Sequence, residues 1–326
     1  MFILTKLVFE SYLKGTSTFL GLVVILVFLV GCAGSSGDMT APRFIYDREG
    51  SAITVPAEID TIVAIAPSIV EVLVDIGVGE RIIAVDDESV GIAGLNATTS
   101  FALNIMAVDA EYIINLMPDI VFTTDMIRLG DAYNDPLAPL AAVGITVVYV
   151  PTSATIADIQ EDIRFIANVM NVYDAGEELI AYMQAQINEI LQTVAGIAQQ
   201  RTVYFEISPA PWMFSFGTGT FLHEVIEIVG ATNIFTDQVG WLPVTDEMLL
   251  ERNPDIILTS TNYISDPIGE ILARPGFGAI SAVQNGAVFF IDTNTSSRPN
   301  HNIVIAMRQI AQAVFPEYFQ GQPPKT

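Results

Sequence analysis

The sequence predicts an α/β protein with two lobes, each a mainly parallel sheet flanked by helices, joined by one long rigid helix. Short apolar, strand-like runs alternate with helical segments in both halves, which is typical of parallel βα units. A pattern also occurs twice: a glutamate, six residues, then Pro-Asp-Ile, beginning at Glu111 and at Glu247. An internal repeat of this kind indicates two similar lobes rather than one large core. The 326 residues are enough for two domains of ordinary size.

The first 31 residues are expected to be a lipoprotein signal peptide. An apolar run at 19–30 follows a basic start, which is typical of a secretory signal. The run is too short for a membrane span, which needs about 20 residues. Leu29–Cys32 is similar to a bacterial lipobox, so we expect the sole cysteine, Cys32, to carry lipid and residues 32–43 to form a flexible tether. An ordinary signal peptide with an incidental cysteine is the alternative.

The N-terminal lobe is assigned to residues 44–172 and is expected to open with a β-hairpin. Proline and glycine then separate apolar runs of strand length from short helices. The hairpin is predicted at Phe44–Val55, strands at Thr61–Ala66, Ile82–Val85, Ile120–Thr124 and Ile145–Val150, and helices at Ser68–Ile76, Ala110–Leu116 and from Ser153 or Thr155 to Met170.

The interlobe helix is assigned to residues 173–199, with its regular part from Asp174 to Ala198. At about 1.5 Å per residue, about 25 residues extend close to 37 Å, enough to run the height of a domain pair. The C-terminal lobe, residues 200–326, repeats the alternation of strands and helices. Its strands are predicted at Thr202–Ile207, Ile256–Thr259 and Val288–Ile291, and its helices at Phe221–Val229, Asp246–Arg252 and Ile303–Val314.

Charge and motif content exclude several functions. The net charge of −24 argues against binding of nucleic acid and against broad adhesion to anionic lipid. The two histidines are not spaced as a metal pair, so a site for a bare metal ion, which needs three or four converging ligands, would have to use carboxylates. No phosphate loop, nucleophile elbow or zinc-hydrolase motif occurs. We therefore predict no catalytic residues, no metal site, no cofactor and no enzymatic activity.

The two repeated glutamates have a local and a functional interpretation. Glu111 and Glu247 each follow a plausible N-cap, Asp109 and Thr245, by two residues. A carboxylate in the first helical turn stabilises the helix dipole by about 0.3–1 kcal/mol, which would explain one of them. Helices of parallel α/β lobes begin on the side where strands end, and ligand crevices open there. We expect both glutamates on the rim of an interlobe cleft, where they dock a partner.

Aromatic residues follow strands of the second lobe. Trp212, Phe214 and Phe216 come directly after one strand, Trp241 follows Gly240, and Tyr263 follows another strand. Both tryptophans of the chain are expected in loops. Aromatic loop residues at strand ends suit a large, partly apolar ligand. Packing beneath the loops is the alternative for each.

Charged residues after strands complete the predicted ligand site. Arg298 lies in a polar loop, where it is expected to face an anionic group of the ligand, or to form an ordinary surface ion pair. Glu88 and Asp125 occupy comparable positions after strands of the first lobe.

Several of these segments together resemble a known family. Ile62–Leu73, the two Glu-x6-Pro-Asp-Ile runs and the loop before Arg298 resemble the iron-siderophore and cobalamin substrate-binding proteins of ABC importers, over roughly residues 42–319. The resemblance implies lobes tied by one helix and only a small closure. It implies that Glu111 and Glu247 engage one basic pocket on each subunit of a permease dimer. It also implies ligand contacts at Trp241, Phe214 and Arg298.

The resemblance also reduces the range of candidate ligands. Glu88 stands where a tyrosine is common, and Ile105 or Met106 where the cobalamin binder has a tryptophan, so a ferric siderophore is favoured over cobalamin. The shortage of basic residues disfavours a strongly anionic catecholate. Haem is a third ligand, with Met106, Met126, Met213 or Tyr263 as axial ligand. The expected protein is an extracytoplasmic lipoprotein anchored to the cell membrane; a surface adhesin on the same scaffold is the competing class.

Overall fold

The computed structural model describes residues 41–95, 102–104, 107–128 and 135–319. They belong to one compact unit, Thr40–Thr326. The predicted signal peptide, the lipidation site Cys32 and the predicted ligand residue Met106 lie outside the described residues. Within the described ranges, no helix is both long and apolar enough to cross a membrane.

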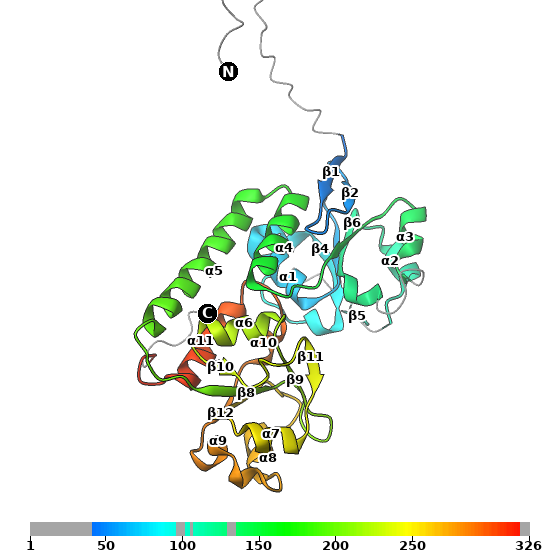
Figure 1. The fold of residues 1–326 in the computed structure, drawn as a ribbon. Helices are drawn as coiled ribbons and strands as arrows, with labels where there is room; N and C mark the ends of the chain where they lie inside the picture. The colour runs from blue at the N-terminus through cyan, green and yellow to red at the C-terminus, as the bar shows by residue number, and fades with distance from the viewer. Residues whose placement is uncertain (1–40, 96–101, 105–106, 129–134, 320–326) are drawn as a thin grey trace, which may run out of the picture. The chain divides into compact units, whose positions relative to one another are not determined.

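The first lobe is built on a five-stranded parallel sheet (Figure 1). Its strand order is β5 (Ala102–Leu103), β4 (Ile82–Asp86), β3 (Ile62–Ala64), β6 (Ile120–Thr124) and β7 (Thr146–Val150). The antiparallel hairpin of β1 (Arg43–Tyr46) and β2 (Ala52–Val55) precedes it, as predicted. The helices of this lobe are α1 (Pro67–Leu73), α2 (Ala110–Leu116), α3 (Ala138–Ala142) and α4 (Ile156–Val169).

The second lobe contains a four-stranded parallel sheet and a small antiparallel one. The order of the larger sheet is β10 (Thr232–Asn233), β8 (Thr202–Glu206), β12 (Ile256–Thr259) and β13 (Val288–Phe290). The smaller sheet pairs β9 (Phe214–Phe216) with β11 (Trp241–Pro243). The helices are α6 (Phe221–Ile228), α7 (Asp246–Arg252), α8 (Pro267–Ala273), α9 (Ser281–Gln284), α10 (Thr293–Ser297) and α11 (Ile303–Val314). The predicted fold class, two parallel sheets flanked by helices, is confirmed.

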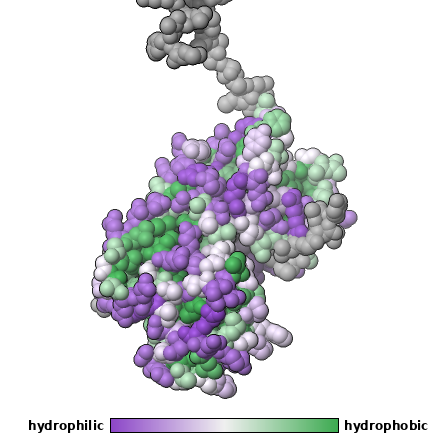
Figure 2. Space-filling view, viewed as in Figure 1, coloured by the Kyte–Doolittle hydropathy of each residue, from purple (hydrophilic) through white to green (hydrophobic). Residues whose placement is uncertain are grey.

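Helix α5 (Tyr173–Val194) lies between the two sheets in the sequence and contacts both lobes. Its 22 residues extend about 33 Å, and it ends four residues earlier than predicted. It packs against α4 and the turn after α1 on one side, and against α6 and α11 on the other (Figure 1). Apolar side chains gather over this helix on the face shown in Figure 2. The rigidity of the connector and the lobe boundaries stay predictions.

The hydrophobic core is continuous between the lobes. One cluster of buried side chains includes Ile62 and Leu73 from the first lobe, Ile187 from α5, and Phe205 and Met307 from the second. Separate clusters lie on the other face of each sheet. The two predicted lobes therefore share one continuous inner layer of buried side chains. Because α5 carries apolar side chains on a stripe at helical spacing, it joins the two inner layers.

The duplicated Pro-Asp-Ile pattern forms the same hydrogen-bonded staple in both lobes. Asp119 Oδ2 accepts from the Thr61 backbone N at 2.8 Å and from Thr61 Oγ1 at 2.9 Å, and Asp119 N donates to Thr61 Oγ1 at 3.0 Å. Asp255 makes the equivalent three bonds with Thr202 at 2.8, 2.9 and 3.0 Å. Each staple joins the starts of two neighbouring parallel strands. These hydrogen bonds between strands thus explain the Pro-Asp-Ile part of the repeat.

Removing either staple is expected to destabilise the protein. Asp119→Ala and Asp255→Ala should each lower the free energy of unfolding by about 1–3 kcal/mol, because a backbone N–H and a hydroxyl lose their acceptor. Asp60→Ala, at an exposed neighbouring position, is the matched control. Chemical denaturation measures the difference. If both variants lose no more free energy of unfolding than the control, the staples do not stabilise the protein.

The Asp119 staple also has a defined pH dependence. Although burial opposes it, hydrogen bonds from Asp60 and Thr61 hold the pKa of Asp119 below its ordinary value. A carboxyl group with a lowered folded-state pKa stabilises the fold above its unfolded pKa, about 3.9. That stabilisation is lost as pH falls through the lowered value. The Asp119→Ala effect should therefore shrink in strong acid.

Candidate functional site

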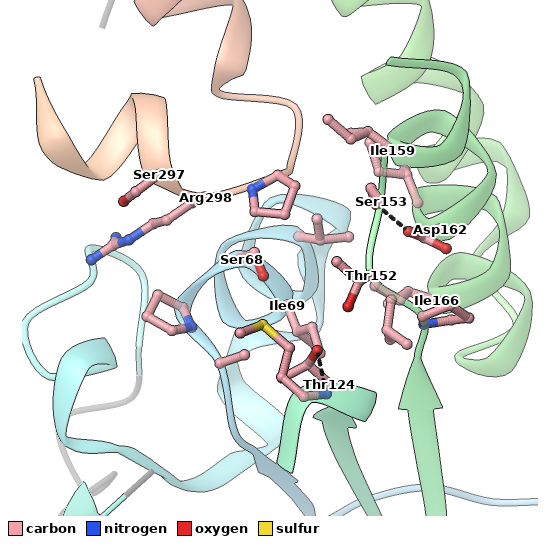
Figure 3. A pocket seen from close by; sticks show the side chains of 18 residues that line it. Ser68, Ile69, Thr124, Thr152, Ser153, Ile159, Asp162, Ile166, Ser297 and Arg298 are labelled. Atoms are coloured by element: carbon pink, nitrogen blue, oxygen red, sulfur yellow. Dashed lines mark hydrogen bonds between the residues drawn. The ribbon is translucent and has the colours of Figure 1, made fainter. Parts of the chain in front are cut away.

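A cavity of about 200 Å³ lies at the carboxyl edge of the first sheet (Figure 3). Residues that follow three neighbouring strands line it, because parallel strands end at the same edge. The second lobe contributes Ser297–Pro299. The rest of the lining is Ala66–Ile69, Val72, Thr124, Met126, Val150–Ser153, Ile159, Asp162, Ile163 and Ile166. The cavity is where the sequence predicted a ligand crevice, and both lobes form its wall.

Asp162 is a buried carboxylate in the wall of this cavity. Its Oδ2 accepts a hydrogen bond from Ser153 Oγ at 2.6 Å (Figure 3). Its Oδ1 accepts from Arg48 Nε at 2.8 Å, and the same guanidinium donates to the Thr152 carbonyl at 2.6 Å. Burial raises the pKa of Asp162 to about 6, although the bonds from Ser153 and Arg48 oppose this. Arg48 thus compensates a charge inside the protein and ties the β1–β2 hairpin to α4.

Arg298 is paired within the protein in this structure. Its Nη1 donates to Glu71 Oε1 of the first lobe, and its Nη2 donates to the Glu88 carbonyl at 3.4 Å. In Figure 3 the side chain extends away from Asp162 and Thr152. The predicted polar loop before Arg298 is the short helix α10, which Asp292 caps by accepting from the Thr295 N at 2.8 Å. The sequence left two roles open for Arg298, a contact with an anionic group of the ligand and an ion pair. The structure contains an ion pair, and it joins the two lobes.

The aromatic residues Phe214, Phe216 and Trp241 lie on strands, so their prediction as loop residues was wrong. In the β9–β11 pair, Trp241 stands opposite Phe216 and Pro243 opposite Phe214. Phe216 is fully buried and contacts Trp241 edge to face, with ring centroids 5.9 Å apart. Phe216 therefore belongs to the core and supports Trp241, which corrects its prediction as a ligand contact.

Four of the predicted aromatic contacts expose their rings. The exposed fractions are 82% for Trp212, 70% for Tyr263, 47% for Trp241 and 37% for Phe214. None of them lines the cavity of Figure 3. Large exposed rings can stack against an apolar ligand surface. Their role as ligand contacts stays a prediction.

A buried ionic cluster that the sequence did not indicate lies next to the Trp212 segment. Arg274 Nη1 and Nη2 donate to the two carboxylate oxygens of Glu206 at 2.6 and 3.0 Å. Arg274 Nε donates to Glu270 Oε1 at 2.9 Å, and Nη1 lies 3.2 Å from Met213 Sδ. Burial raises the pKa of Glu206, although Arg274 opposes this. Met213 is 5% exposed, which argues against its predicted role as an axial haem ligand.

The two repeated glutamates are exposed at equivalent helix starts. Glu111 follows the cap Asp109, whose Oδ1 accepts from the Glu111 N at 2.9 Å. Glu247 follows the cap Thr245, whose Oγ1 accepts from the Met248 N at 3.4 Å. Both predicted caps are confirmed. The exposed carboxylates are available to a partner, and their docking role stays a prediction.

The two acidic residues predicted on the first lobe do not line the cavity. The Glu88 side chain is exposed, and Glu88 contacts Arg298 through its carbonyl oxygen. Asp125 Oδ1 accepts from Thr152 Oγ1 at 2.9 Å. Asp125 lines a different groove, between the β1–β2 hairpin and the β7 edge. Neither carboxylate contacts the cavity of Figure 3 in this structure.

Two parallel sheets with a crevice at the carboxyl edge, walled by both lobes, define a bilobal solute-binding protein. The family model described as periplasmic binding protein matches residues 62–295, and the chain belongs to this family. It is 24% identical over 318 residues to the uncharacterized ABC transporter substrate-binding lipoprotein YvrC of Bacillus subtilis, covering 94% of this chain and 99% of the relative.

Two further relatives have descriptions that name a ligand. The vitamin B12-binding protein of Vibrio cholerae is 25% identical over 263 residues, covering 80% of this chain and 91% of the relative. A crystal structure from Staphylococcus epidermidis, described as a possible iron-binding (periplasmic solute-binding) protein, is 26% identical with a TM-score of 0.70. It covers 79% of this chain and 99% of that one. These relatives are described as binding proteins, which agrees with the prediction of a non-enzyme.

Proposed function

We propose that this protein is the extracytoplasmic substrate-binding component of an ABC importer. It binds its ligand between the lobes and delivers it to a permease dimer that works with an ATPase, without breaking a bond. The observation that carries the proposal is the crevice at the carboxyl edge of the first sheet, to which the second lobe contributes Ser297–Pro299. Membership of the periplasmic binding protein family supports the same function.

The ligand we propose is a large metal–organic complex, with a ferric siderophore as the first candidate. The exposed rings of Trp212, Phe214, Trp241 and Tyr263 suit such a ligand. The cavity of about 200 Å³ is smaller than the roughly 300–1,000 Å³ of sites for drug-sized ligands. A siderophore must therefore also contact surface outside this cavity. The iron-binding description of the Staphylococcus epidermidis relative supports this candidate.

Cobalamin is the second candidate. The relationship to the vitamin B12-binding protein of Vibrio cholerae favours it, since that match covers most of both chains. Haem is a third candidate, for which the exposed Tyr263 and Met126 remain as axial ligands. The surface adhesin gains no support from the family match, and we do not propose it.

The proposed location is the outer face of the cell membrane, with the protein anchored through lipid on Cys32. The lipobox-like run supports the anchor, as does the description of the Bacillus subtilis relative as a lipoprotein. Mass spectrometry of the protein purified from membranes should find Cys32 at the N-terminus with acyl chains attached. A mature N-terminus elsewhere, with an unmodified cysteine, would contradict the anchor.

The absorption spectrum of the protein purified from its own host tests the ligand class. Ferric hydroxamates, corrins and haem absorb in different regions, so a bound molecule identifies its class directly. We expect a ferric chelate band, or a corrin spectrum if the second candidate is correct. A nucleotide or peptide recovered in stoichiometric amount would overturn the proposal.

A further inference from the structure

The segment after α10 binds helix α1 of the first lobe through one carboxylate, that of Glu71. Glu71 Oε1 pairs with Arg298 Nη1. Glu71 Oε2 accepts from Asn300 Nδ2 at 2.6 Å and from Asn302 Nδ2 at 3.0 Å. Both oxygens of the Glu71 carboxylate are therefore engaged by the second lobe.

The pair with Glu71 neutralises the charge of Arg298 at the cavity. Among the described residues that line it, Arg298 is the only lysine or arginine. The Arg298 and Glu71 side chains are 14% and 13% exposed, so solvent screens their interaction weakly. An anionic ligand would have to displace the Glu71 carboxylate from Arg298 and would be repelled by it.

The neighbouring charges do not restore a positive site. Arg48 does not line the cavity and is paired with the lining residue Asp162 at 2.8 Å. Just beyond the end of α1, Asp75 Oδ2 lies 2.6 Å from His301 Nε2, so that a second carboxylate faces the same segment. Arg298 Nη2 also donates to the backbone carbonyl of Glu88 at 3.4 Å, and the Glu88 residue is exposed.

We propose that Glu71 sets the charge selectivity of the site by holding Arg298 in a neutral pair. The site then admits neutral or cationic metal complexes and rejects anionic ones. This inference rests on the proposed function and deepens it, because it assigns the charge class of the ligand. A residue that only tied the lobes together would change the affinity for all ligands alike.

The test uses ligand pairs of nearly equal size that differ in charge. One pair is ferrioxamine B, a cation, and its N-succinyl derivative, an anion; the other is cyanocobalamin and its monocarboxylic acid. Calorimetric titration of the purified protein measures the affinity ratio within each pair. We expect wild type to favour the neutral or cationic member about tenfold or more, and Glu71→Gln to shift that ratio about tenfold toward the anion.

Three variants separate charge selectivity from a structural role. Asp75→Asn removes a carboxylate that lies two residues beyond α1 and leaves Arg298 paired, so its ratio should match wild type. Glu71→Gln combined with Arg298→Gln should lose the gain in anion affinity. Arg298→Gln alone leaves the Glu71 carboxylate uncompensated and should widen the preference against anions. That last variant tests the inference even if Glu71→Gln does not fold.

Each outcome of these titrations either supports or overturns the inference. A ratio that shifts in Glu71→Gln and not in Asp75→Asn supports the inference. Equal changes for both members of a pair would overturn it and leave Glu71 as an interlobe tie. If wild type binds neither pair, the proposed ligand class fails, and this inference fails with it.

Discussion

Replacing Glu111 and Glu247 together by arginine is expected to abolish ligand uptake and leave ligand affinity unchanged. Both carboxylates are exposed on the second residue of equivalent helices, α2 and α7. If each engages a basic pocket on one permease subunit, charge reversal replaces an attraction by a repulsion at both contacts. Uptake by whole cells and calorimetric affinity of the purified protein are the two measurements.

Matched controls distinguish docking from a general charge effect. Glu58→Arg with Glu251→Arg changes the net charge equally, at exposed positions away from the helix starts. Uptake should survive in this control. A loss of affinity in the Glu111/Glu247 variant would place the glutamates in the ligand site, and normal uptake would show that the permease docks elsewhere.

Trp241→Ala is expected to weaken ligand binding by about 2–4 kcal/mol, roughly 30- to 1,000-fold, as for an aromatic anchor. The ring is 47% exposed, and Phe216 and Phe221 hold it at centroid distances of 5.9 and 6.3 Å. A ligand can therefore bury the free surface of Trp241 without ordering a flexible side chain.

A comparable apolar truncation elsewhere serves as the control for Trp241. Leu272 on α8 is 44% exposed, and Leu272→Ala should leave affinity unchanged. Calorimetry is preferable to fluorescence here, because the substitution removes one of two tryptophans. Equal affinities of the Trp241 variant and wild type would show that the β9–β11 surface does not contact the ligand.

Local signals explain why much of the fold was predictable. Proline and glycine mark the ends of strands and helices, and the caps Asp109, Thr155 and Thr245 mark helix starts. The parallel sheets follow from the alternation of these elements. The pairing of β9 with β11 was missed because each strand has three residues and the partners are 25 to 29 residues apart. The sequence alone gives no signal for so short and distant a pairing.

The candidate site was harder to predict from the sequence than the fold, because it depends on contacts between residues that are far apart in the chain. Arg298 and Glu71 are 227 residues apart, so the sequence could indicate a charged loop residue but not its partner. The burial of Phe216 depends in the same way on Phe205 and Trp241. The repeat was predictable as a pattern, but its Asp119 and Asp255 staples required the partners Thr61 and Thr202.

Ligand titration of the purified protein tests the central claim, capture of a large metal–organic complex, most directly. Tryptophan fluorescence and calorimetry would follow the addition of ferric hydroxamate, catecholate and carboxylate chelates, cobalamin and haem. We expect saturable one-to-one binding of a ferric chelate or of cobalamin, with quenching of tryptophan fluorescence. The absence of heat and of quenching with every member of this panel would contradict it.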